Sequence, residues 1–449
     1  MKFWKDKVFL KSMIVIAIPI ALQNLITSSL NMVDTLMITS LGDASIAAVG
    51  LANQVFFFYA LINFGIHTGS SIFISQYWGK KDIINIRKVL GLAITLSAIT
   101  GVIFTVAAFF FPELIMSILI KDAEVIQLGV DYLRIVSLSY IITGIAFAYS
   151  IALRSTGRPN VPMMVSAISF VTNTVFNYLL IFGKFGFPEL GVKGAALGTL
   201  IARIVEIIFV LYVVYSNVGP LSATLAELFD WSREFVNRYI KTIAPVILNE
   251  AFWSLGQIMY AIAYARIGKE ATAAIQLTTN IQNIFYVLVR GLANACAVMV
   301  GNKIGAQDEE GAYDYAIKFL SISTTIGLVL GVIMVLTPDL TLKIFGDLSP
   351  ELYMSARNLL IIMGFAFFIR AYNSTAIVGV LRGGGDTKFS MFLEMGAVWL
   401  VGVPLAFIGA LVLKIPVYYV FLLVSLEEVV KFLVSIPRIL SKKWIQDLT

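Results

Sequence analysis

Asp34 is an acidic residue inside a long apolar stretch, in the sequence Asn31-Met32-Val33-Asp34-Thr35. An ionisable group in apolar surroundings is costly, and within a membrane-spanning segment it is a functional candidate by default. A carboxylate with amide and hydroxyl oxygens nearby suits the binding of a proton or a sodium ion. The alternative interpretation is a polar contact that only holds helices together.

Three further polar residues could complete a site around Asp34. Asn173 and Asn177 are one helical turn apart and therefore share a face of the expected helix, and Thr199 belongs to the next apolar segment. We predict a cation-coupling site from these four side chains, with Na⁺ binding possible at Asp34, Asn173 and Asn177. For the two asparagines, hydrogen bonding between helices is the competing interpretation.

Glu250 is the second acidic candidate, five residues after Pro245 in another apolar segment. We predict a role in cation coupling or substrate binding. The alternative is a structural ion pair with Arg290 or Arg370. The pair Arg203/Glu206 and the group Glu427, Glu428 and Lys431 are also expected to be structural.

Candidate contacts for an organic substrate are Asn31, Trp253, Tyr260 and Asn373. A broad apolar and aromatic cavity with one or two acids suits amphipathic organic cations. The chain has one cysteine and one histidine. These counts exclude a disulfide framework, a metal site built from cysteines and a cluster of histidines. No cofactor is expected beyond H⁺ or Na⁺ as the coupling ion.

The composition places these residues in transmembrane helices. Of the 449 residues, 59% are hydrophobic and only 13% are charged, whereas a soluble domain carries roughly 25% charged residues. Uncharged runs reach the length of about 20 residues that a helix needs to cross a bilayer, and they do not alternate as barrel strands do. We predict an all-α integral membrane protein with twelve transmembrane helices. They are expected near residues 12–38, 46–77, 89–111, 132–152, 161–182, 194–216, 242–265, 273–301, 317–337, 357–380, 389–411 and 415–437.

The basic residues indicate the orientation of these helices. With the N-terminus inside, the inner segments hold twenty lysines and arginines and the outer loops hold eight. This bias predicts a multi-pass protein of the cell membrane with both termini in the cytoplasm. The net charge of +6 therefore reflects cytoplasmic loops, and no nucleic-acid partner is expected.

The chain repeats itself at a numbering offset of 226, which has slipped to 228 by position 153. Matched pairs include Pro19/Pro245, Gly42/Gly268, Asp82/Asp308, Pro112/Pro338 and Arg154/Arg382. The repeat predicts two six-helix lobes, 1–216 and 242–449, related by a pseudo-two-fold axis along the membrane normal. Residues 217–241 between them are expected to form an amphipathic linker on the cytoplasmic surface.

Two parallel repeats around a cleft are typical of transporters. The chain has no Walker pattern and no nucleotide-binding domain, and its glycine-rich segment at Gly383–Asp386 is expected to be a tight cytoplasmic turn. We therefore expect a secondary transporter driven by an ion gradient rather than an enzyme. We expect it to act as a monomer in the lipid bilayer.

Several segments resemble the multidrug and toxic compound extrusion (MATE) transporters. These are the region from Pro19 to Met37, Gly42-Asp43 with the following Ala47–Gly50, Leu153–Gly157, and Gly379–Thr387. The resemblance implies two six-helix lobes that export small, diverse and often cationic drug-like compounds in exchange for H⁺ or Na⁺.

The resemblance also implies roles for individual residues. Asp34 matches the N-lobe cation-site acid of the family, and Asn173, Asn177 and Thr199 match its polar partners. Glu250 matches the C-lobe acid of the NorM-type branch. Two departures stand out: Asn177 occupies the position of a second aspartate in some DinF-type members, and Asn373 lies where NorM-type members have a second C-lobe acid. Each ion site is therefore expected to have one acid, which weakly favours protons.

Two rival functions remain. A flippase for lipids or lipid-linked saccharides, from the same superfamily, would favour a cleft lined by many basic residues, but few arginines lie at mid-membrane depth here. A channel or receptor-like membrane protein is disfavoured by the six-plus-six duplication with a lone acid in the first helix.

Overall fold

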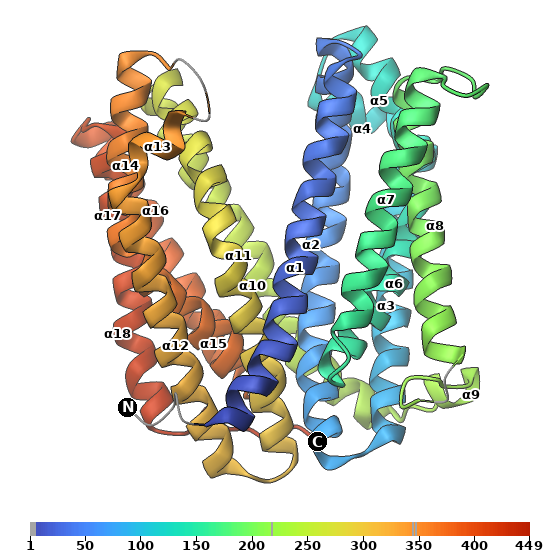
Figure 1. The fold of residues 1–449 in the computed structure, drawn as a ribbon, viewed down its shortest axis with the longest axis vertical. Helices are drawn as coiled ribbons and strands as arrows, with labels where there is room; N and C mark the ends of the chain where they lie inside the picture. Colours follow the sequence, from blue (N-terminus) through green and yellow to red (C-terminus); the bar gives the residue numbers. More distant parts are fainter. Residues whose placement is uncertain (1–5, 217–218, 344, 346–347) are drawn as a thin grey trace. The chain divides into compact units, whose positions relative to one another are not determined.

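The computed structural model describes residues 6–216, 219–343, 345 and 348–449 (Figure 1). These residues are predominantly helical and contain no strand, only one isolated antiparallel bridge between Gly385 and Ile445. The chain divides into two compact units. We call Leu22–Ile243 the N-unit, and Met1–Ala21 together with Ala244–Thr449 the C-unit.

Two long helices contribute to both units. Helices α1 (Lys7–Thr39) and α10 (Arg233–Ile267) each begin in one unit and end in the other. The N-unit also contains α2 (Asp43–Lys80), α3 (Ile83–Phe110), α4 (Pro112–Leu119), α5 (Ala123–Val136), α6 (Ser139–Ser155), α7 (Asn160–Phe182), α8 (Val192–Ser216) and α9 (Leu225–Leu228).

The C-unit is built from α-helices and three π-helical segments, labelled η. They are α11 (Lys269–Gly305), α12 (Glu309–Leu336), α13 (Pro338–Lys343), α14 (Pro350–Ser374), η2 (Thr375–Arg382), α15 (Thr387–Gly396), η3 (Ala397–Gly402), α16 (Val403–Phe407), η4 (Ile408–Val412), α17 (Val417–Val424) and α18 (Leu426–Leu440).

Each of the twelve expected spans falls on a helical segment, so the predicted all-α membrane fold is confirmed. Among the described residues, nine helices are long and apolar enough to cross a membrane, or ten when α5 and α6, bent by 48°, count as one span. The seventh and twelfth expected spans, α10 and α17–α18, are not in this set. They carry Glu250 and the group Glu427, Glu428 and Lys431, which interrupt their apolar pattern.

The sequence repeat reappears in the helix boundaries. Helices α1, α2, α3 and α4 begin at Lys7, Asp43, Ile83 and Pro112, and α10, α11, α12 and α13 begin at the positions that the repeat offset assigns to them. The caps repeat as well: Asp82 accepts a hydrogen bond from the backbone N–H of Asn85, and Asp308 accepts one from Gly311. These carboxylates satisfy backbone donors that the first helical turn leaves without partners.

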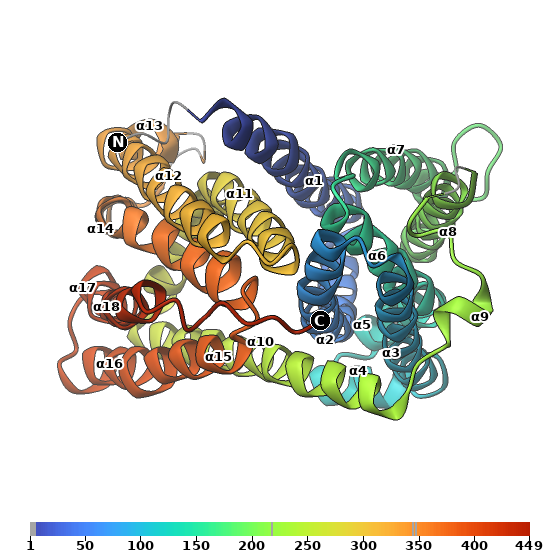
Figure 2. The same cartoon turned by 90° about the horizontal axis from the view of Figure 1, so that it is seen from below.

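The expected linker contains a short helix that is fastened to α3. Figure 2 shows α9 beside α3 at the edge of the N-unit. Thr224 and Glu227 form a capping box at the start of α9. The Arg87 guanidinium of α3 donates to Glu227 and to the carbonyl oxygen of Pro220. The rest of the expected linker, from Arg233 onward, is the beginning of α10.

The glycine-rich segment after η2 is a tight turn, as predicted. Gly385 has φ = +93°, a conformation that glycine adopts without strain. The C-terminal tail packs on this turn: the backbone N–H of Gln446 donates to the carbonyl oxygen of Gly384 (2.9 Å), and the Trp444 side chain is fully buried.

Candidate functional site

The predicted N-terminal cation site forms a connected chain of hydrogen bonds within the N-unit. Asn177 Nδ2 donates to Asp34 Oδ1 at 2.8 Å and to Asn173 Oδ1 at 3.1 Å. Asn173 Nδ2 in turn donates to Thr199 Oγ1 at 3.3 Å. The structure therefore brings together all four residues that the sequence proposed for this site.

The tight packing of α7 against α8 positions the two asparagines. Asn173 and Asn177 face α8 from adjacent turns of α7, and each side chain is only 1% exposed. Gly198 of α8 lies against the Asn177 amide. Because glycine has no side chain, the two helices approach closely there, as small residues allow in membrane bundles.

One oxygen in this chain has no hydrogen-bond partner among the described residues. It is Oδ1 of Asn177, which is buried. In the observed orientation the amide nitrogen faces Asp34, which suits an ionised carboxylate. Rotation of the amide would present the free oxygen to Asp34, which suits a protonated carboxyl group or a cation between the two residues, but it would also end the donation to Asn173 Oδ1.

Two neighbours of this site were not recognised from the sequence. The Tyr132 hydroxyl of α5 donates to Asn53 Oδ1 of α2 at 3.3 Å and also hydrogen-bonds Thr199. A tyrosine and an asparagine on separate helices give no local pattern, so only the packing of α2, α5 and α8 joins them to the site.

A buried ion pair continues the polar face of α8. Arg203 Nη1 lies 2.6 Å from Glu206 Oε2, which confirms the predicted structural pairing. Ser169 of α7 donates to the same carboxylate oxygen at 3.3 Å. Thr199, Arg203 and Glu206 follow helical spacing on α8, and Ser169, Asn173 and Asn177 follow it on α7. The α7–α8 interface therefore carries polar contacts over several turns.

The predicted C-terminal acid, Glu250, forms an ion pair within the C-unit, with a partner that the sequence analysis did not name. Arg382 Nη1 lies 2.7 Å from Glu250 Oε1, and Arg382 Nη2 lies 2.8 Å from Glu394 Oε2. Asn249 Nδ2 donates to Glu394 Oε2 at 2.6 Å. The alternative interpretation is a structural ion pair with Arg290 or Arg370; the structure shows an ion pair, but its arginine is Arg382.

The two arginines proposed as partners lie elsewhere. The Arg290 guanidinium lies over the Tyr286 ring, 5.3 Å from its centroid. Arg370 donates to Gln282 Oε1 at 2.6 Å, and its Nε is 3.8 Å from Glu428 Oε1. The distance along the sequence does not tell which of the three arginines pairs with Glu250. The folded chain brings η2, with Arg382, close to Glu250 of α10 and Glu394 of α15.

Two acids from other helices lie beside the residues expected at the C-terminal site. Glu394 shares Arg382 with Glu250. At Asn373, where the tenth span has no carboxylate, Glu428 of α18 accepts a hydrogen bond from Nδ2 at 2.7 Å.

The four substrate candidates have different surroundings. Asn31 is exposed, and Trp253 is 37% exposed. Tyr260 is buried, and its hydroxyl donates to Glu427. Asn373 is buried with its amide on Glu428. The structure thus leaves Asn31 and Trp253 accessible, while the polar groups of Tyr260 and Asn373 engage the acids of α18.

Glu427, Glu428 and Lys431 form the structural cluster that their spacing predicted. The Lys431 ammonium lies 3.3 Å from a carboxylate oxygen of each glutamate. With Arg370 nearby, the cluster contains two acids and two bases.

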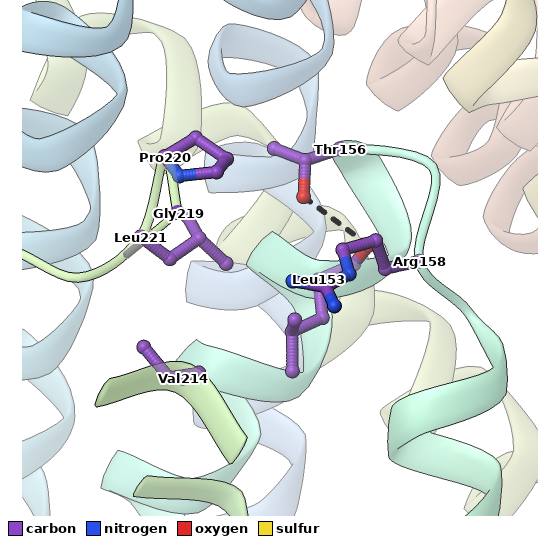
Figure 3. Close-up of a pocket in the computed structure, with 7 residues that line it drawn as sticks. All are labelled: Leu153, Thr156, Arg158, Val214, Gly219, Pro220 and Leu221. Carbon is purple, nitrogen blue, oxygen red and sulfur yellow. Dashed lines mark hydrogen bonds between the residues drawn. The ribbon is translucent and has the colours of Figure 1, made fainter. Parts of the chain in front are cut away.

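Two cavities of the structure lie away from these acids. One lies between the end of α6 and the start of the linker, lined by Leu153, Thr156, Arg158, Val214, Gly219, Pro220 and Leu221 (Figure 3). It has about 10 Å³ of free volume, room for roughly one water molecule. A groove of about 430 Å³ within the C-unit is lined mainly by apolar side chains of α12 and α18. Within the described ranges, no cluster of three or more His, Cys, Asp or Glu side chains could hold a metal ion.

Comparison with known proteins decides the family. The sequence model of the MatE family matches two stretches, residues 19–179 and 245–408. The chain belongs to the MatE family. The two matched stretches begin at Pro19 and Pro245, which are a matched pair of the internal repeat. The family is one of multidrug and toxic compound extrusion transporters rather than enzymes, so this is a multi-pass membrane transporter.

Relatives of this MatE protein match over nearly its whole length. It is 28% identical to the "Uncharacterized transporter YisQ" of Bacillus subtilis (strain 168), with 92% of this chain and 90% of the relative covered. It is 26% identical to the "Probable multidrug resistance protein NorM" of Thermotoga maritima, with 89% and 85% covered. A solved structure, an outward-facing multidrug resistance MATE family transporter of the MOP superfamily, has the same fold, with a TM-score of 0.87, 21% identity and 96% of each chain covered.

Proposed function

We propose that this protein is a secondary active multidrug efflux antiporter. It exports amphipathic, often cationic organic compounds in exchange for H⁺ or Na⁺. The observation that carries the proposal is the hydrogen-bonded chain Asp34–Asn177–Asn173–Thr199. It holds one carboxylate of a membrane-spanning helix among polar groups that suit either its charged or its neutralised form.

The substrate class follows from relatives and from the accessible candidates. The related NorM of Thermotoga maritima is described as a multidrug resistance protein. Trp253 offers an aromatic face to an organic cation, and Asn31 offers an amide close to Asp34 along α1. Tyr260 and Asn373 would contribute only if Glu427 and Glu428 release them.

The ion would drive transport by biasing two conformations. Neutralising Asp34 removes a charge from apolar surroundings, and a ligand shifts an equilibrium by its differential affinity for the two states. We propose alternating access of the two six-helix lobes in a monomer. The protein would lie in the plasma membrane with both termini in the cytoplasm, as the distribution of basic residues favours.

Transport in reconstituted vesicles tests this function. Purified protein would be incorporated into liposomes with an imposed H⁺ or Na⁺ gradient, and movement of a fluorescent organic cation such as ethidium would be followed. We expect uphill transport with one of the two gradients and none after an ionophore collapses it. Transport of the cation that ignores both gradients would contradict the antiport mechanism, and movement of a labelled lipid in place of the cation would favour the flippase alternative.

A further inference from the structure

One partly buried arginine of the N-unit has no acidic partner among the described residues. Arg154 lies at the end of α6, and its guanidinium hydrogen-bonds only to Gln23 of α1 within the described part of the chain. The other partly buried arginines of this unit, Arg87 and Arg203, each form an ion pair with a glutamate. Arg154 is therefore the exception, a shielded cation whose charge no described carboxylate balances.

The acid of the predicted cation site does not supply this missing charge. Gln23 and Asp34 both belong to α1, and a rise of about 1.5 Å per residue places them about 16 Å apart along the helix axis. An ion pair needs its charged atoms within about 4 Å. A charge that is shielded from water and lacks a counter-charge costs free energy, so Arg154 favours an anion beside it.

The groups around Arg154 leave hydrogen-bond donors without acceptors. A guanidinium has five N–H donors. Gln23 Oε1 accepts from Nε of Arg154 at 3.1 Å and also from Nη2, so Nη1 has no partner among the described residues. Gln23 Nε2 donates to Ser166 Oγ at 2.9 Å, and the hydrogen of that hydroxyl has no acceptor among the same residues. Arg154 and Ser166 thus contact one amide, and both keep donors for a further group.

Free donors beside an unbalanced positive charge suit a negatively charged oxygen group. A carboxylate or a phosphate accepts two parallel hydrogen bonds from one guanidinium, and such charge-assisted bonds are about twice as strong as neutral ones. Gln23 occupies the edge of the Arg154 guanidinium formed by Nε and Nη2. The edge formed by Nη1 and Nη2 therefore remains for an anion.

The corresponding arginine of the C-unit shows which group this framework accommodates. Arg382, the repeat partner of Arg154, lies 2.7 Å from a carboxylate oxygen of Glu250 and 2.8 Å from one of Glu394. The repeat offsets assign Asn24 to Glu250 and Ser166 to Glu394. The C-unit supplies carboxylates to its arginine from its own chain, whereas the N-unit has neutral residues at both positions. Carboxylate oxygens beside the guanidinium thus fit one copy of the repeat, and the other copy lacks them.

We propose that Arg154 and Ser166 form a binding site for the anionic oxygen group of a ligand, a carboxylate or a phosphate. An organic solute with a carboxylate and a membrane lipid with a phosphate share this chemistry. The site lies apart from Asp34 on α1, so an anion bound at Arg154 and a cation bound at Asp34 do not compete for the same groups.

Thermal unfolding of the purified full-length protein, measured at constant ionic strength, tests this site. Each anion is compared with a neutral molecule of similar shape: benzoate with benzamide, and phosphatidylglycerol with diacylglycerol of the same acyl chains. A ligand that binds only the folded state raises the unfolding temperature as its concentration increases. We expect a rise with at least one anion and with neither neutral molecule. A rise with benzoate alone assigns the site to organic carboxylates, and a rise with phosphatidylglycerol alone assigns it to lipid phosphates.

Two substitutions should remove the anion effect by different routes. Arg154→Gln removes the cation, and the apparent affinity should fall about tenfold or more, the equivalent of one hydrogen bond to a charged group. Ser166→Glu keeps the arginine and adds a carboxylate where the repeat places Glu394. This variant should unfold at a higher temperature without ligand and should no longer respond to the anion. The matched control, Arg158→Gln, removes an exposed arginine of the following turn and should behave like the wild type.

An equal anion effect in the wild type, Arg154→Gln and Ser166→Glu would overturn the proposal, and so would the absence of a rise with both anions. Ser166→Glu keeps the test decisive where Arg154→Gln does not fold, because its arginine is unchanged. The measurement needs neither a gradient nor transport, so its result does not depend on the proposed antiport.

Discussion

Gly198 of α8 lies so close to the side chain of Asn177 of α7 that any β-carbon at position 198 would force this contact to shift. A β-carbon at position 198 would lie 2.1 Å from Oδ1 of Asn177 and 3.0 Å from its backbone nitrogen. The same asparagine holds the Asp34 carboxylate. The geometry of the ion site therefore depends on the absence of a side chain on the neighbouring helix.

We expect Gly198→Ala to impair ion-coupled transport. The added methyl group must displace the Asn177 amide or separate α7 from α8, and overpacking of this kind costs about 1–3 kcal/mol. The amide would then lose its contact with Asp34. Vesicle transport and thermal unfolding of the variant would measure both effects.

Gly50→Ala is the matched control, because a β-carbon at position 50 of α2 has nothing within 4 Å. Alanine is favoured over glycine in a helix by about 1 kcal/mol, so this variant should keep transport and stability. Wild-type transport by Gly198→Ala would show that the close contact is dispensable.

We expect Asp34→Asn to abolish ion-coupled export while the protein still folds. Asparagine keeps the size and hydrogen-bonding capacity of the side chain but cannot take up a proton. Drug resistance of cells producing the variant and gradient-driven uptake in vesicles would measure the loss. Asp43→Asn, at the exposed start of α2, is the control and should transport normally. Full activity of Asp34→Asn would refute the proposed coupling role.

We expect Glu250→Gln to weaken transport less completely than Asp34→Asn, or only for some substrates. Glu394 still pairs with Arg382 in this variant, so no charge is left without a partner and the fold should survive. A reduction in transport of up to about tenfold, equivalent to about 1.4 kcal/mol, is expected. Transport of several organic cations, measured together with the membrane yield, would check it. A variant that no longer inserts into the membrane would favour a purely structural role.

Glu227 should make the start of the linker sensitive to pH. Hydrogen bonds from the backbone N–H and the hydroxyl of Thr224, together with the Arg87 guanidinium, hold the pKa of Glu227 below its usual value. A carboxyl group whose pKa is lower in the folded state stabilises that state above its unfolded pKa, about 4.3. This stabilisation disappears as the pH falls through the lower folded value.

Hydrogen exchange of residues 219–231 would measure this effect as protection factors across pH. Protection should fall in the wild type as the pH drops below about 4. Glu227→Gln can still form the capping box but should lack this pH dependence. Asp230→Asn, whose aspartate pairs with Lys88 at 2.9 Å, should retain it. Equal pH profiles for wild type and Glu227→Gln would contradict the prediction.

The sequence predicted the N-terminal site because its signals are local. Asp34 stands out in an apolar helix, and Asn173 and Asn177 share a face through helical spacing. Tyr132 and Asn53 could not be found in this way, since they reach Thr199 from other helices through packing alone.

The all-helical membrane fold, the internal repeat and the acids worth testing could all be predicted from the order of the residues. Composition, run length and repeated spacing are properties of the chain that do not depend on how its helices pack. Tertiary structure alone decided that Arg382 rather than Arg290 or Arg370 binds Glu250, and that Glu394 is the second acid there. A charged side chain pairs with an opposite charge that lies near it in the folded protein. Glu250 and Arg382 are 132 positions apart in the sequence, so only the packing of η2 near α10 brings them together.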